Sequence, residues 1–147
     1  MRNNVSRILW SAGFLLVMVG CKTVSTPYKP LHGFNVTNRG TTPINNVVIR
    51  YGPVTQSFCK PICGAKNGGG GGWFSYMAIE DEMTVTWNTS DGLSHMEAIA
   101  VREKLLAPDR LNSLMFFFVE EKLTVLQGLS FVQPGAVGLE TFPLFNN

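Results

Sequence analysis

The sequence predicts an all-β protein, an antiparallel β-sandwich that is immunoglobulin-like in outline and has about seven strands. From residue 31 onward, the chain contains short runs rich in β-branched and aromatic residues, several with alternating polarity. Turn-forming residues separate these runs roughly every 8–12 residues, which is typical of sandwich folds. No strand–helix–strand alternation is visible in the sequence, which argues against a parallel sheet.

The expected strands are, in order, 34–38, 44–51, 73–79, 83–89, 93–101, 114–119 and 123–126. Asp91-Gly92 predicts a hairpin turn, because glycine adopts a positive φ without cost and aspartate tolerates it. A second hairpin joins the last two strands. Its Phe116–Phe118 run predicts a strand buried on both faces or an aromatic surface covered by a partner. Only residues 103–114 have helical composition, and Pro108 interrupts them.

Residues 1–20 are typical of a bacterial lipoprotein signal peptide. The basic residues Arg2 and Arg7 precede an uncharged stretch from residue 8 to 20. This stretch is shorter than the roughly 20 apolar residues that span a bilayer. It ends in Met18-Val19-Gly20-Cys21, which matches the lipobox pattern. We therefore expect cleavage before Cys21 and lipidation of that cysteine. The alternatives are an N-terminal anchor helix and cleavage at another site.

Residues 21–30 are then a lipidated tether, and residues 31–147 are the single sandwich domain. The tether has no apolar periodicity. Lys22 follows the cysteine in place of the aspartate that retains lipoproteins in the inner membrane. We therefore expect attachment to the inner leaflet of the bacterial outer membrane, with the domain facing the periplasm.

The two remaining cysteines, Cys59 and Cys63, predict a disulfide because the periplasm is oxidising. The loop between them is short, so its closure contributes only about 2 kcal/mol of stability. A redox site typically has C-x-x-C spacing, and no second Cys/His pair completes a metal site. We expect no metal and no cofactor.

Charge also limits the possible partners. Only 15% of the 147 residues are charged, where about 25% is usual. The net charge of +2 comes from the signal, since ten basic and ten acidic residues remain without Arg2 and Arg7. A neutral mature chain argues against nucleic acid as a partner, because nucleic-acid binding needs a basic surface.

The most unusual segment runs from Phe58 to Trp73 and contains five consecutive glycines at 68–72. It is not a phosphate-binding loop, because neither a Lys-Ser/Thr pair nor a helix follows the glycines. Two interpretations remain open. The segment is either a flexible connector between the disulfide and Trp73, or a loop whose bare backbone approaches a protein partner. In the second interpretation the contact residues are Phe58, Lys60, Lys66, Gly70 and Trp73.

No set of residues demands catalysis, so we do not expect an enzyme. Ser94, His95 and Asp91 invite comparison with a catalytic triad, but adjacent strand residues point to opposite faces. His95 is interpreted as a surface residue, and His32 has no evident companion. The acidic run 80–82 is interpreted as a solvated turn, with Ca²⁺ binding, acid–base work or contact with a basic partner as alternatives.

Four features together indicate a resemblance. They are the lipobox ending at Cys21, the Gly68–Trp73 run, the Met83–Trp87 segment, and Asp91-Gly92 followed by Val101-Arg102. With these features the chain resembles small bacterial lipoproteins encoded beside type VI secretion phospholipase effectors. The resemblance covers roughly residues 31–107. It implies an immunity protein that binds and neutralises a toxin, and it carries over no catalytic residue.

An alternative function belongs to a different class. A sandwich-fold lipoprotein can be a structural component of an envelope or secretion complex. Deletion would then abolish secretion, whereas deletion of an immunity protein would cause self-killing with secretion intact. A periplasmic hydrolase or ligand-binding protein is a third class.

Overall fold

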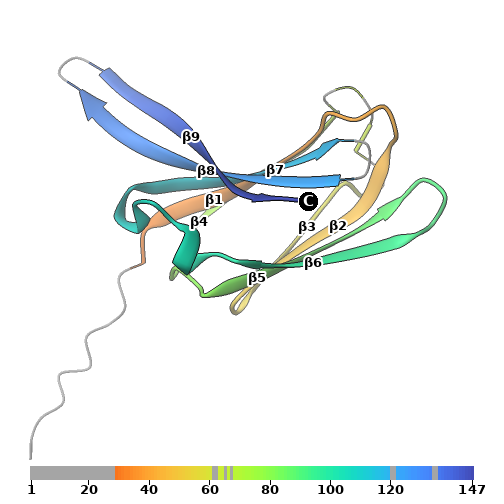
Figure 1. Cartoon of the computed structure of the whole chain (residues 1–147), viewed down its shortest axis with the longest axis horizontal. Helices are drawn as coiled ribbons and strands as arrows, with labels where there is room; N and C mark the ends of the chain where they lie inside the picture. The colour runs from red at the N-terminus through yellow and green to blue at the C-terminus, as the bar shows by residue number, and fades with distance from the viewer. Residues whose placement is uncertain (1–28, 61–62, 65, 67, 120–121, 134–135) are drawn as a thin grey trace, which may run out of the picture.

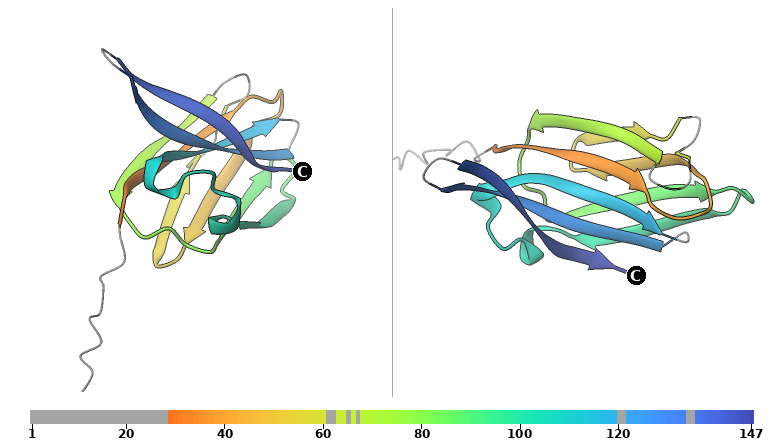
Figure 2. Two further views of the ribbon diagram at one scale, coloured as in Figure 1. Left: turned by 60° about the vertical axis from the view of Figure 1, so that its left-hand side comes forward. Right: turned by 90° about the horizontal axis from the view of Figure 1, so that it is seen from above.

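Two β-sheets pack face to face in the computed structural model, which describes residues 29–60, 63–64, 66, 68–119, 122–133 and 136–147 (Figures 1 and 2). One sheet has five strands in the order β4-β1-β7-β8-β9, and the other has four in the order β3-β2-β5-β6. The strands are β1 (Leu31–Asn38), β2 (Ile44–Tyr51), β3 (Val54–Phe58), β4 (Gly68–Tyr76), β5 (Glu82–Thr89), β6 (Ser94–Ala100), β7 (Leu111–Val119), β8 (Lys122–Gln133) and β9 (Ala136–Asn146).

The all-β sandwich predicted from the sequence is confirmed. Neighbouring strands pair antiparallel except β1 and β7, which run parallel. The Asp91-Gly92 turn joins β5 to β6, and the second expected hairpin is β7–β8. The β8–β9 hairpin extends beyond the other strands at the upper left of Figure 1.

The described residues contain nine strands where the sequence predicted about seven. The additional strands are β3 and β9. Their composition gave no strand signal: β3 has only five residues, with three polar residues between Val54 and Phe58, and β9 contains Gly138 and Pro143. Both form because a neighbouring strand supplies hydrogen-bond partners for their backbone.

The expected helical content reduces to two single turns, η1 (Arg102–Lys104) and η2 (Pro108–Arg110). Leu111–Leu114, expected to be helical, begins strand β7. Pro108 starts η2, where its missing N–H is not needed, and the chain is extended again at Leu111. Residues 102–110 therefore connect the two sheets.

The core lies between the sheets and is rich in aromatic side chains. Phe34 on β1 stacks on Trp73 of β4 with ring centroids 5.5 Å apart. It also meets Phe116 of β7 and Tyr51 of the opposite sheet edge to face, at 5.9 and 5.7 Å. This cluster joins three strands of one sheet to β2 of the other. The run 116–118 is divided between the faces, with Phe116 and Phe118 buried and Phe117 half-buried beneath the Arg39 guanidinium.

Gly33 allows β1 and β4 to approach closely, and its replacement tests this packing. A Cβ at Gly33 would lie 2.2 Å from the Trp73 carbonyl oxygen and 2.5 Å from the Phe74 ring. We expect Gly33→Ala to lower the free energy of unfolding by about 2–3 kcal/mol, because backbone must move to make room. Urea denaturation measures this change.

Gly69→Ala is the matched control, because nothing lies within 4 Å of a Cβ at Gly69 on the neighbouring strand. Its expected effect is within about 0.5 kcal/mol. Equal stabilities of the two variants would contradict this account of the β1–β4 contact.

Candidate functional site

The glycine run expected to lie in a connector or loop forms a strand. Gly68–Gly72 belongs to β4, which pairs antiparallel with β1 at the edge of the five-stranded sheet. The register shifts between Val36 and Thr37, so β4 contains an extra residue, and Gly71 adopts a φ of +98°. Glycine is required at that bulge. Both interpretations are therefore wrong about the conformation of these residues, because β1 supplies the backbone partners that the glycines lack locally. Contact of this segment with a partner stays a prediction.

The five sequence-predicted contact residues lie in different environments. Phe58 is buried at the end of β3, and Trp73 is half-buried against Phe34. Lys60 and Lys66 are exposed, and Gly70 lies within β4. The two aromatic residues thus stabilise the sandwich, and only the two lysines and the glycine strand remain accessible to a partner.

Cys59 and Cys63 lie at disulfide-bonding distance, with their Cα atoms 4.6 Å apart. Both side chains are buried. Cys63 also forms a two-way backbone bridge with Ile44, and the Cys59 carbonyl accepts a hydrogen bond from the Asn46 N–H. The pair therefore holds the chain after β3 against the start of β2.

The outer face of the five-stranded sheet has an unusual composition. Strand alternation and register place no Asp, Glu, Lys or Arg in its central rows, and the one charged group over them is the Arg39 guanidinium, which lies on Phe117 at one end of the face. We call this surface the uncharged face and define it by Leu31, Gly33, Asn35, Thr37, Gly69, Gly72, Phe74, Tyr76, Ser113, Met115, Phe117, Thr124, Leu126, Gly128, Leu139, Thr141 and Pro143.

Large apolar side chains of the uncharged face are open to solvent. Tyr76 is 71% exposed, Phe74 is 53% exposed and Leu139 is 47% exposed. The Leu139 and Met115 side chains both lean over Gly128, since a Cβ there would be 3.2 Å from each. An apolar surface of this kind is typical of a protein-binding site.

The outer face of the four-stranded sheet is different. Its central rows carry the hydroxyl side chains of Thr55, Thr84 and Thr86, with Arg50 beside them. Met96 is an exposed apolar residue on this face. An antiparallel sheet with one face in solvent usually carries polar side chains on that face. The outer face of the four-stranded sheet fits this pattern, and the uncharged face does not.

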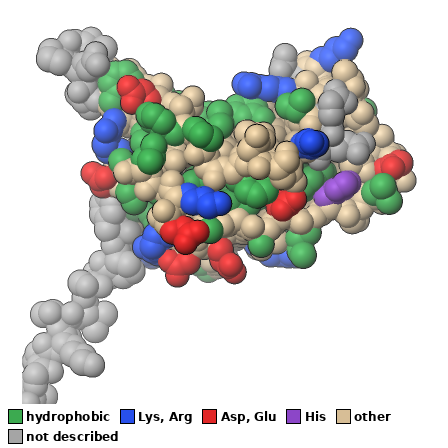
Figure 3. Space-filling view, in the orientation of Figure 1, with side chains coloured by type: hydrophobic (Ala, Val, Ile, Leu, Met, Phe, Trp, Pro, Cys, Tyr) green, Lys and Arg blue, Asp and Glu red, His purple; other side chains and the backbone are tan. Residues whose placement is uncertain are grey.

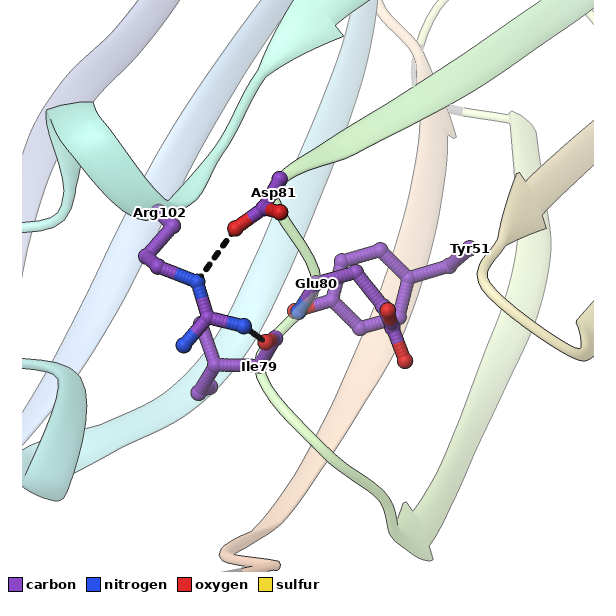
Figure 4. Close-up of polar contacts among 5 residues, drawn as sticks. All are labelled: Tyr51, Ile79, Glu80, Asp81 and Arg102. Carbon is purple, nitrogen blue, oxygen red and sulfur yellow. Dashed lines mark hydrogen bonds and ion pairs between the residues drawn. The ribbon is translucent and has the colours of Figure 1, made fainter. Parts of the chain in front are cut away.

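The acidic turn 80–82 is tied to the fold. Arg102 donates a hydrogen bond from Nε to Asp81 at 2.5 Å and another to the Ile79 carbonyl (Figure 4). The Glu80 N–H donates to the Tyr51 hydroxyl at 3.0 Å. Burial raises the pKa of Tyr51 to about 12. The turn is therefore held by one cation and one buried phenol.

A surface pocket of about 360 Å³ lies beside this turn. Its lining consists of Arg50, Gly52, Glu80, Asp81, Glu82, Met83 and Thr84. Charged side chains gather at the lower left of Figure 3, in the region where Figure 1 places η1 and the start of β5. Within the described ranges, no group of three or more His, Cys, Asp or Glu side chains is placed to hold a metal ion.

The three residues of the triad comparison have separate partners. The Ser94 hydroxyl donates to the Asn88 side chain at 2.9 Å. Asp91 accepts hydrogen bonds from the Thr89 hydroxyl and the Leu93 N–H, and these bonds hold its pKa below the ordinary value. His95 stacks on Trp87 with ring centroids 5.1 Å apart. It is half-buried, so its interpretation as a surface residue is wrong.

His32, for which the sequence showed no evident companion, is fully buried and has two neighbours. Its Nδ1 lies 3.1 Å from the Pro30 carbonyl oxygen, and its ring meets Tyr51 edge to face at 5.7 Å. Its Nε2 has no hydrogen-bond partner among the described residues. Burial lowers the pKa of His32, and the Pro30 carbonyl opposes that shift.

Sequence reasoning missed the exposed residues Phe74, Tyr76 and Leu139. One signal was present for the first two, since Phe74 and Tyr76 alternate with Trp73 and Ser75 and so share one face of the strand. No comparable signal existed for Leu139, because strand β9 was not predicted. Cys21 and the predicted signal peptide, residues 1–20, lie outside the described residues.

Comparison of the chain with known protein families, curated proteins and solved structures finds no match. Neither short helix in the described part of the chain has the length and apolar content that a membrane-crossing helix needs.

Removal of the cysteine pair tests its contribution to stability. We expect Cys59→Ala with Cys63→Ala to lower the free energy of unfolding by about 2 kcal/mol or more, because loop-closure entropy is lost and buried side chains shrink. Chemical denaturation under oxidising conditions measures this. A reductant should shift the midpoint of the wild type and leave the variant unchanged. A wild-type denaturation midpoint that does not change with reductant would argue against the disulfide.

His32 makes stability depend on pH. Its folded-state pKa is lower than that of the unfolded chain, so protonation favours unfolding. The stability is fully present above the unfolded pKa of about 6.5 and decreases below it, by at most about 2 kcal/mol at pH 5. Thermal denaturation between pH 7.5 and 5 measures the loss. The His32→Phe variant should lack this dependence, and an unchanged pH profile would refute the assignment.

Proposed function

We propose that this chain is a lipid-anchored, periplasm-facing protein that binds and neutralises a toxin, a phospholipase effector of a type VI secretion system. The anchor is Cys21, on the inner leaflet of the outer membrane, and the oxidised Cys59–Cys63 pair suits that compartment. The uncharged face is the surface that contacts the toxin. This proposal is carried by that face, which exposes Phe74 and Tyr76 on one edge strand and Leu139 on the other.

The composition of the uncharged face supports a protein partner. Interfaces are enriched in Tyr, Phe and Met and depleted of Lys, Glu and Asp, and their cores exclude charge. The face has Tyr76 and Phe74 at one side and Met115 with Leu139 near the middle. A toxin that buries about 800 Å² of this surface can reach nanomolar affinity if these side chains fill its pockets.

The tether supports inhibition at the membrane surface. The chain from Cys21 to Leu31 reaches at most roughly 35 Å when extended. The domain therefore stays next to the bilayer on which a phospholipase acts. Anchoring raises the local concentration of the inhibitor at that surface, as linkage does for any pair of tethered binding partners.

Protection of cells tests the proposal. The product of the gene adjacent to the gene for this chain, which the proposal identifies as a phospholipase effector, is expressed in the periplasm, with and without the chain. We expect survival only with the chain, and co-purification of the two proteins. Death of cells that produce both proteins, or the absence of a complex, would refute the function. Loss of secretion on deletion would favour a structural component of the secretion complex instead.

A variant of the uncharged face tests where the toxin binds. Leu139→Glu places a charge among Met115, Gly128 and the toxin, so we expect the dissociation constant to rise at least tenfold. Met96→Glu is the matched control, since Met96 is also exposed and apolar but lies on the other sheet. Equal effects of the two variants, measured by calorimetry, would contradict the assignment of this face.

A further inference from the structure

The free edge of β4 has no role in the proposed toxin contact. We propose that β4 pairs antiparallel with β4 of a second copy of this chain, forming a twofold symmetric dimer. Two five-stranded sheets would then become one continuous sheet. This inference does not depend on the identity of the toxin.

The four edge strands of the sandwich differ in how they are protected from such pairing. Strand β3 has only five residues, and β9 contains Glu140 and Pro143. Strand β6 contains Glu97, which accepts a hydrogen bond from the Asn147 side chain. Short length, charge, proline, bulges and covering groups are the usual protections of an edge, and β4 has one of them, the bulge at Gly71. Strand β4 has nine residues and neither a charge nor a proline.

The glycines of β4 are more numerous than the subunit requires. Gly71 needs glycine for its positive φ, and a Cβ at Gly68 would lie 2.1 Å from the Gly64 carbonyl oxygen. Gly69 and Gly72 have no such constraint. A Cβ would meet nothing within 4 Å at Gly69 and only ordinary contacts at Gly72. Bare backbone at these two positions is explained by a neighbour that approaches them closely.

The strand is complementary to itself. Antiparallel pairing centred on Gly72 places Tyr76 of each copy beside the glycine half of the other, while Phe74 stays over Gly33 of its own subunit. The subunit already contains this arrangement twice across paired strands. The Phe74 ring covers Gly33, and the Phe131 ring covers Gly138 at 2.1 Å from a Cβ position. Aromatic side chains thus replace the missing packing of glycine.

Charge supports the same orientation. Lys66, which is exposed, precedes the glycine end of β4, and the acidic turn 80–82 follows its aromatic end. Antiparallel pairing brings the lysine of each copy toward the acidic turn of the other, twice by symmetry. Parallel pairing would place like charges together at both ends. The chain's own sequence is therefore the partner that suits this edge.

The dimer is compatible with two membrane anchors. Tyr76 lies beside the start of the domain, where the Met77 N–H donates to the Pro30 carbonyl. The two Tyr76 residues of the dimer would be separated by about eight strand positions, or roughly 27 Å. Both tethers can then reach one bilayer when the twofold axis is perpendicular to it.

Photocrosslinking of the full-length lipidated chain in cells tests the dimer. Tyr76 is replaced by p-benzoylphenylalanine, which the exposure of this side chain permits. We expect a covalent product of twice the monomer mass, whose composition is checked by mass spectrometry. The same replacement at Leu93, which is exposed at the β5–β6 turn, should give no such product.

A second substitution makes the test specific to the edge. Adding Gly72→Lys should reduce the Tyr76 product at least tenfold, because it places a charge at the centre of the paired strands. Thr55→Lys, the same charge on an edge strand of the other sheet, should leave the product unchanged. Matching melting temperatures confirm that both variants fold. No dimer product, a product containing a different protein, or a product that survives Gly72→Lys would overturn the proposal.

Discussion

The aromatic cluster around Phe34 is the interaction on which the rest of the structure depends. Phe34 contacts Trp73, Phe116 and Tyr51, and so links β1, β4 and β7 to the opposite sheet. Strand β4 pairs with β1 alone, so Trp73 is its main attachment to the core. Because strand residues alternate, fixing Trp73 inward directs Phe74 and Tyr76 outward. The inner cluster therefore determines which residues the outer surface presents.

The two outer faces show how one alternating pattern can serve two purposes. In β5 the buried residues Met83, Val85 and Trp87 alternate with threonines, and the outer face is polar. In β7 the buried residues alternate with Ser113, Met115 and Phe117, and the outer face is apolar. A strand that is apolar on both sides costs solubility unless something covers it. The uncharged face lacks the polar outer side chains that a solvent-exposed sheet usually has, and this difference supports the proposal that it binds a partner.

The strands predicted correctly are those with strong local signals. The β5–β6 hairpin follows from Asp91-Gly92 between alternating segments, and β2 follows from its β-branched residues. The site was predicted less well. Phe58 and Trp73 were candidate contact residues, yet they pack against the core. The sequence did not show this, because an aromatic residue of the core and one of an interface look the same in a sequence. His95 was treated as a surface residue, although stacking on Trp87 buries it in part, and the companion of His32, Tyr51, was not evident in the sequence.

The sequence by itself determined the fold class, the hairpin turns and the pairing of Cys59 with Cys63, because each depends on residues close together in the chain. Only the tertiary structure decided that Gly68–Gly72 is a strand, that β1 lies between β4 and β7, and that one outer face lacks charge. These features depend on which strands become neighbours. Glycine has no side chain that favours one conformation, so the conformation of Gly68–Gly72 depends on hydrogen bonds with the backbone of β1.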